Sequence, residues 1–204
     1  MAEMNPHLTT HPVETEMPAA PDNSVLGVWI WLSAESLFFA SLIATFLLLH
    51  NQTNGGPGLG RLIDLQLTFI ATVTLLSSSL TMALGYAQVL KGNLGGFRFW
   101  LVVTALLGLG FAGMQAFEFH HLYTQGFSLS SSPAGSAFFT LTGFHGLHVL
   151  FGAFWLISLL AFSFKKEFVE EAAVKVKVLG LYWHFVDVVW VIIFTVVYLM
   201  GKVA

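Results

Sequence analysis

The sequence predicts an all-α polytopic membrane protein built as a bundle of five transmembrane helices. The chain has 204 residues, of which 56% are hydrophobic and only 9% are charged, and its mean hydropathy is +0.77. Soluble domains carry about 25% charged residues. Five apolar runs each reach the ~20 residues that a helix needs to cross the hydrocarbon core. None alternates like the strand of a membrane barrel.

Polar breaks separate the five predicted spans. Residues 25–49 form the first span, which ends at the sequence NQTNGGPG. The second span, residues 65–90, ends at Lys91-Gly92-Asn93, and the third covers residues 97–123. A serine-rich loop, 128–133, precedes the fourth span, 136–164, and a charged connector, 165–177, leads to the fifth, 178–200. Residues 25–204 therefore form one membrane domain.

Residues 1–24 are predicted to be a disordered tail, because they are rich in proline and acidic side chains. They lack the basic and apolar regions of a signal peptide. The chain has no cysteine, which excludes disulfides and thiolate metal sites. It also has no basic patch that would indicate nucleic-acid binding.

The lysines and arginines predict the orientation of the chain. On the N-terminal side of the predicted bundle the sequence places Lys91, Arg98, Lys165, Lys166, Lys175 and Lys177, whereas the other side has Arg61 and Lys202. This excess predicts a cytoplasmic N-terminus and an external C-terminus in a bacterial cell membrane.

Rows of small residues spaced by four predict close helix contacts. These rows are Ser36, Ala40 and Ala44 in the first span; Ser77, Thr81 and Gly85 in the second; and Gly108, Ala112 and Ala116 in the third.

Several ionisable residues lie inside the apolar spans, where exposure to lipid would be costly. They are Glu35 in the first span, Glu118 with His120 and His121 at the end of the third, His145 and His148 in the fourth, and His184 and Asp187 in the fifth. His145 and His148 are three residues apart and share a helix face, as do His184 and Asp187. We expect interhelical hydrogen bonds, with Asp187 accepting one from a histidine or a hydroxyl.

Other roles for these polar residues stay open. The histidines and acids could bind iron or copper, or form a proton path. Lys165 and Lys166 could bind anionic lipid headgroups.

Two long motifs resemble subunit III of the haem–copper terminal oxidases. Residues 142–149 read TGFHGLHV and residues 182–190 read YWHFVDVVW. Shorter stretches, AESLFF at 34–39 and QAFEF at 115–119, resemble the family's first-helix and third-helix motifs. The resemblance extends over nearly all of residues 26–201 and matches the short, five-helix bacterial form.

The resemblance implies a non-catalytic subunit of a proton-pumping oxidase. Haem and copper are then expected in partner subunits, and none on this chain, which would have no catalytic or metal-binding residue. The implied partners are subunit I, which reduces O2, together with subunit II, a small subunit IV and bound phospholipid. Glu35, Glu118, His145, His148, His184 and Asp187 become the buried polar interior, and the chain would stabilise subunit I and support proton uptake.

The electron donor of the complex is predicted from a single residue of these motifs. Phe144 in the sequence GFHGLH resembles cytochrome c oxidase members more than quinol oxidase members, so cytochrome c is favoured and quinol is the alternative. A relative associated with nitric oxide reductase and a stand-alone membrane metalloenzyme also stay open. A transporter is disfavoured because no inverted repeat is evident.

Overall fold

The fold comes from a computed structural model that describes residues 23–55, 58–165 and 168–199. It contains five long helices that are long and apolar enough to cross a membrane, which confirms the predicted fold class. These are α1 (Asn23–Leu49), α3 (Leu65–Leu90), α4 (Leu94–Thr124), α5 (Pro133–Phe162) and α6 (Phe168–Ile193). A short helix, α2 (Leu59–Leu62), precedes α3, and a π-helical segment, η1 (Phe194–Leu199), continues α6.

Side-chain caps explain where three of the helices begin. Asp64 accepts hydrogen bonds from the backbone N–H groups of Gln66 and Leu67 and so starts α3 at the predicted residue. The Asn93 side chain accepts a hydrogen bond from the backbone N–H of Gly96 and caps α4, which therefore starts earlier than the predicted span. Ser132 caps Gly135, and Pro133 occupies the first turn of α5, which also starts earlier.

The predicted connector between the fourth and fifth spans is wrong over most of its length. Residues from Phe168 onward are helical and belong to α6. Ala172, Val176 and Leu179 recur on one helix face and are buried in the core. The charges had indicated a loop, but they lie on a helix whose other face is apolar.

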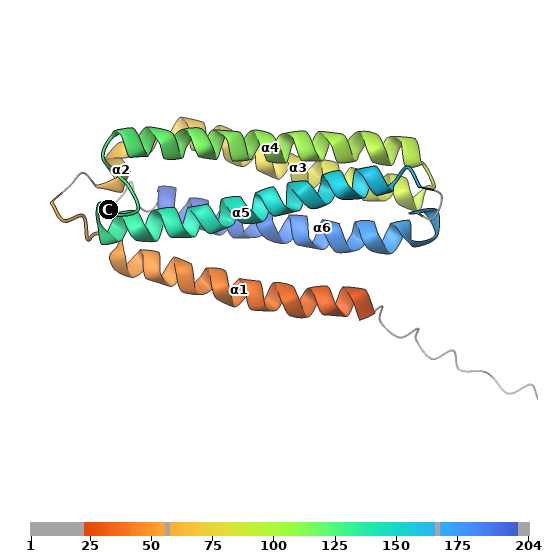
Figure 1. The fold of residues 1–204 in the computed structure, drawn as a ribbon, viewed down its shortest axis with the longest axis horizontal. Coiled ribbons are helices and arrows are strands. Elements are labelled where there is room, and N and C mark those ends of the chain that lie inside the picture. Colours follow the sequence, from red (N-terminus) through yellow and green to blue (C-terminus); the bar gives the residue numbers. More distant parts are fainter. Residues whose placement is uncertain (1–22, 56–57, 166–167, 200–204) are drawn as a thin grey trace, which may run out of the picture.

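The helices α3, α4, α5 and α6 form the compact part of the bundle, and α1 lies along its side (Figure 1). The N-terminal end of α1 diverges from the other helices (Figure 1). In its most apolar window, 17% of α1 residues are buried, compared with 33–44% for the other four spans. The peripheral helix is therefore α1, which packs against α5 and α6.

The tail prediction concerns residues that are mostly outside the described ranges. Residues 1–22 lie outside them, and α1 begins at Asn23, so the last two residues assigned to the tail are helical.

The small-residue rows are only partly confirmed as helix contacts. Gly108, Thr81 and Gly85 are buried. The row Ser36, Ala40 and Ala44 is exposed, as are Ser77 and Ala116. A spacing of four identifies a face of a helix, but it does not identify which neighbour that face meets.

Candidate functional site

Glu118 is the centre of a polar cluster near the end of the bundle where α3 begins. Its side chain is buried, and it accepts hydrogen bonds from Thr68 Oγ1 at 3.0 Å and from the Tyr198 hydroxyl at 2.9 Å. The three residues belong to α4, α3 and η1. The cluster therefore ties three elements together, as expected for an interhelical hydrogen bond.

Glu35 of α1 and His148 of α5 form a second cluster at mid-span. Their carboxylate and imidazole lie 3.3 Å apart, and the side chains are 22% and 17% exposed. Trp31 Nε1 donates to the other carboxyl oxygen of Glu35 at 3.2 Å. The Tyr182 hydroxyl of α6 donates to the carbonyl of His148, and Tyr182 stacks on Trp31.

The hydrogen bonds of His148 fix which ring nitrogen faces Glu35. His148 Nδ1 lies 2.7 Å from the carbonyl oxygen of Phe144, which can only accept, so Nδ1 carries a hydrogen. His148 Nε2 then either donates to an ionised Glu35 or accepts from a protonated one. In both cases the hydrogen bond joins α1 to α5.

His184 of α6 bonds to α3 and not to Asp187. His184 Nδ1 lies 2.5 Å from Ser79 Oγ. Asp187 is 3% exposed, and neither of its oxygens has a hydrogen-bond partner among the described residues, although the Ser79 hydroxyl lies beside it. No hydrogen bond to the Asp187 side chain is therefore seen among the described residues, and His184 contacts Ser79 instead of Asp187.

His145 of α5 is fully buried and is surrounded by aromatic rings. It stacks on Trp190 with ring centroids 4.9 Å apart and meets Phe111 and Phe39 edge-on. Neither ring nitrogen has a hydrogen-bond partner within the part of the chain that the structure describes. His145 and His148 thus share a helix and both contact Phe39, but only His148 has polar partners, so the two imidazoles do not form one polar site among the described residues.

The remaining predicted residues lie at the surface or outside the described ranges. His120 and His121 are exposed, and His121 Nε2 lies 2.7 Å from Gln125 Nε2. Lys165 is exposed, with its Nζ 5.5 Å from the centroid of the Phe162 ring. Lys166 lies outside the described residues.

The polar groups do not gather into a set of metal ligands. Among residues 23–55, 58–165 and 168–199, no three His, Cys, Asp or Glu side chains come together in a way that could hold a metal ion. The three-ligand arrangement that the metalloenzyme alternative requires is thus not found in these ranges.

Sequence reasoning missed the role of the hydroxyl residues of α3. Ser78 accepts from Trp183 Nε1 at 2.9 Å, and Thr72 accepts from Trp190 Nε1 at 3.0 Å. With Thr68 and Ser79 they form a line of hydroxyls that bind α4 and α6. The available signal was the run of serines and threonines inside an apolar span, since these residues often bond across helices.

Substitutions at Ser79 and at Asp187 test separately how much the His184 contact and the Asp187 side chain contribute to stability. We expect Ser79→Ala to destabilise the chain by about 1–3 kcal/mol, because it leaves the His184 imidazole without its partner. Asp187→Asn removes no hydrogen bond seen here, so its effect should be smaller. The measurement is the thermal midpoint of the detergent-extracted complex. A larger loss in Asp187→Asn than in Ser79→Ala would contradict this assignment.

Comparisons with known proteins identify the class of protein to which this membrane bundle belongs. A family model described as Cytochrome c oxidase subunit III matches residues 19–202. The chain is 46% identical to cytochrome c oxidase subunit 3 of Bacillus subtilis over 194 residues, which cover 91% of this chain and 94% of that protein. It is 41% identical to cytochrome bo(3) ubiquinol oxidase subunit 3 of Pseudomonas aeruginosa over 204 residues, covering 98% of each.

The chain belongs to the cytochrome c oxidase subunit III family. It is therefore a multi-pass membrane subunit of a respiratory terminal oxidase complex, which confirms the resemblance stated from its motifs.

Proposed function

We propose that this chain is a non-redox structural subunit of a haem–copper terminal oxidase, with haem and copper held by partner subunits. It would pack against subunit I and stabilise it, with subunit II and a small subunit IV as further neighbours. The observation that carries the proposal is the distribution of the interior polar groups. Glu118, Glu35 and His184 each bond to a helix other than their own, at separate places in the bundle. Such contacts hold helices together, whereas a redox centre needs convergent ligands.

A supporting role in proton uptake rests on the Glu35–His148 pair. The two side chains lie within hydrogen-bond distance of each other and remain partly exposed at mid-span. Ionisable groups in that position commonly exchange protons or pair with a neighbouring subunit.

We infer cytochrome c as the electron donor of the complex, with quinol as the second candidate. Phe144 in GFHGLH and the 46% identity to a cytochrome c oxidase subunit favour cytochrome c. Quinol is supported by the 43% identity to quinol oxidase subunit 3 of Bacillus spizizenii over 178 residues, which cover 87% of each chain. The donor would bind other subunits in either case.

The orientation proposed is a cytoplasmic N-terminus and an external C-terminus. Lys91, Arg98, Lys165, Lys175 and Lys177 lie toward the end of the bundle where α1 begins and α3 ends, which agrees with the positive-inside rule. Lys165 at the same end is proposed to contact anionic lipid headgroups, and so is Lys166, which lies outside the described residues.

The proposal is tested by purifying the tagged full-length chain from its own membranes in a mild detergent. We expect a haem-bearing multi-helix partner to co-purify in constant proportion. The same preparation should oxidise reduced cytochrome c faster than a quinol. A chain that purifies without any haem-bearing partner would overturn the subunit assignment. Faster oxidation of the quinol than of cytochrome c would show that quinol, and not cytochrome c, is the donor.

A further inference from the structure

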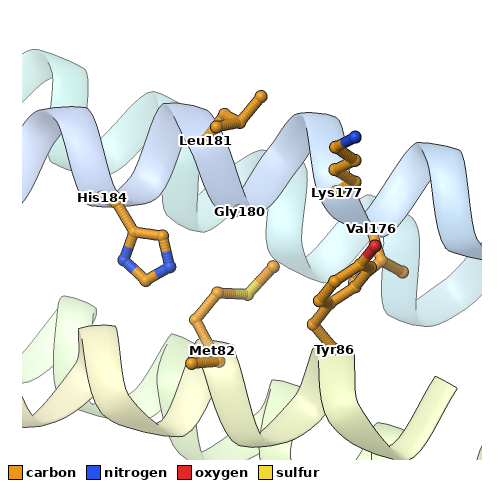
Figure 2. A pocket seen from close by; sticks show the side chains of 8 residues that line it. Met82, Tyr86, Val176, Lys177, Gly180, Leu181 and His184 are labelled. Carbon is orange, nitrogen blue, oxygen red and sulfur yellow. The ribbon is translucent and has the colours of Figure 1, made fainter. Parts of the chain in front are cut away.

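A groove of about 210 Å³ lies between α3 and α6, on a face that the bundle itself does not cover. Met82 and Tyr86 of α3 line one side, and Gly180 and His184 of α6 line the other, as Figure 2 shows. The groove runs along the helices from Tyr86 and Lys177 at one end to His184 at the other (Figure 2). From Lys177 to His184 the helix rises by roughly 10 Å.

Small residues keep the groove open. Ala83 lines it from α3, and Gly180 lines it from α6. A Cβ atom at Gly180 would lie 3.6 Å from the terminal methyl group of Met82 and would therefore occupy groove space. Since the walls are almost entirely apolar, the space suits a hydrocarbon chain and not a polar group.

Two polar side chains of the groove, Lys177 and Tyr86, are at the end nearest the membrane surface, and His184 is at the other end. Lys177 is exposed at the rim, and no acidic side chain among the described residues pairs with it. Tyr86 is half-buried, and its hydroxyl is on the same end of the groove (Figure 2). Lysines this deep in a span direct the ammonium group to the interface, where it attracts anionic lipid phosphates.

We propose that this groove binds an acyl chain of an anionic glycerophospholipid, whose phosphate contacts Lys177 and the Tyr86 hydroxyl. The acyl chain lies over Ala83 and Gly180 and ends toward His184. The inference rests on the lipid-holding part of the proposed function and gives it a specific place, which is separate from Lys165 and Lys166.

The test counts phospholipid retained by the intact oxidase complex, using phosphatidylglycerol as the probe. The complex is stripped by detergent, supplied with phosphatidylglycerol or phosphatidylcholine, washed, and measured for lipid per haem. Lys177→Gln removes the rim charge, and Ala83→Phe fills the groove from an exposed position. The matched controls are Lys91→Gln and Ala116→Phe, which change exposed residues that do not line the groove.

We expect both groove variants to lose one bound phosphatidylglycerol, while both controls retain it and phosphatidylcholine binding is unchanged in all four. Equal retention in the groove variants and in the unmodified complex would overturn the proposal, and so would the same loss in the controls. Detachment of the Ala83→Phe chain from its haem-bearing partner would also overturn the proposal, because it would show that the groove binds a partner subunit and not a lipid. Co-purified haem is measured in every sample, so failure of the lipid site is distinguished from failure of the subunit assignment.

Discussion

Trp183→Ala is expected to destabilise the chain by about 3–5 kcal/mol, the typical cost of removing a fully buried aromatic side chain. Trp183 has no exposed surface and is in contact with three other helices. Its indole N–H donates to Ser78 of α3. Its ring fills the space left by Gly108 of α4 and Gly152 of α5.

Substitutions at Gly108 and Gly152 test the same packing from the other side, by adding atoms where the Trp183 ring lies. A Cβ atom at Gly108 would lie 2.6 Å from the ring of Trp183, and one at Gly152 would lie 2.8 Å from it. Because the indole is rigid and enclosed, we expect Gly108→Val and Gly152→Val to displace it and to lower stability as well.

The measurement is the amount of chain retained in the detergent-extracted oxidase after heating, with Trp29→Ala as the control. Trp29 is 55% exposed on α1 and makes no comparable interior contact. If Trp183→Ala and Trp29→Ala survive heating equally, Trp183 does not hold the bundle together.

Glu118→Leu is expected to destabilise the chain because it leaves the buried Tyr198 hydroxyl without an acceptor. An orphaned buried group costs about 1–3 kcal/mol. Tyr198→Phe should cost less, since Glu118 keeps the hydrogen bond from Thr68. The exposed Tyr123 provides the matched control, Tyr123→Phe.

The double variant Glu118→Leu with Tyr198→Phe separates the hydrogen bond from general damage. Neither side chain is then left unpaired, so its cost should be clearly smaller than the sum of the two single costs. The double-mutant cycle compares the thermal midpoints of four detergent-extracted complexes, which carry the unmodified chain, each single variant and the double variant. Strict additivity would mean that the two side chains do not interact.

The sequence was sufficient to predict the membrane bundle, because length and hydropathy determine which segments can cross a bilayer. The predicted second span coincides with α3, whose start is fixed locally by the Asp64 cap. The fifth span was predicted too short, since Lys175 and Lys177 suggested a connector. In the structure Lys175 lies over the Phe162 ring, so charge at that position is compatible with a helix.

The partners of the polar residues could not be predicted from one sequence. The spacing of His184 and Asp187 placed them on one face of α6, but it could not reveal that Ser79 of α3 faces His184. Likewise, the π-helical turn of η1 buries both Val197 and Tyr198 and brings Tyr198 to Glu118. A regular helical period gives no indication of such a turn.

The central claim is that this chain supports the oxidase without carrying its redox groups. The most direct measurement compares haem and copper per subunit I in complexes assembled with and without this chain. We predict the same haem and copper content in both, with a shorter functional lifetime where the chain is missing. Loss of a stoichiometric haem or copper together with the chain would contradict the account.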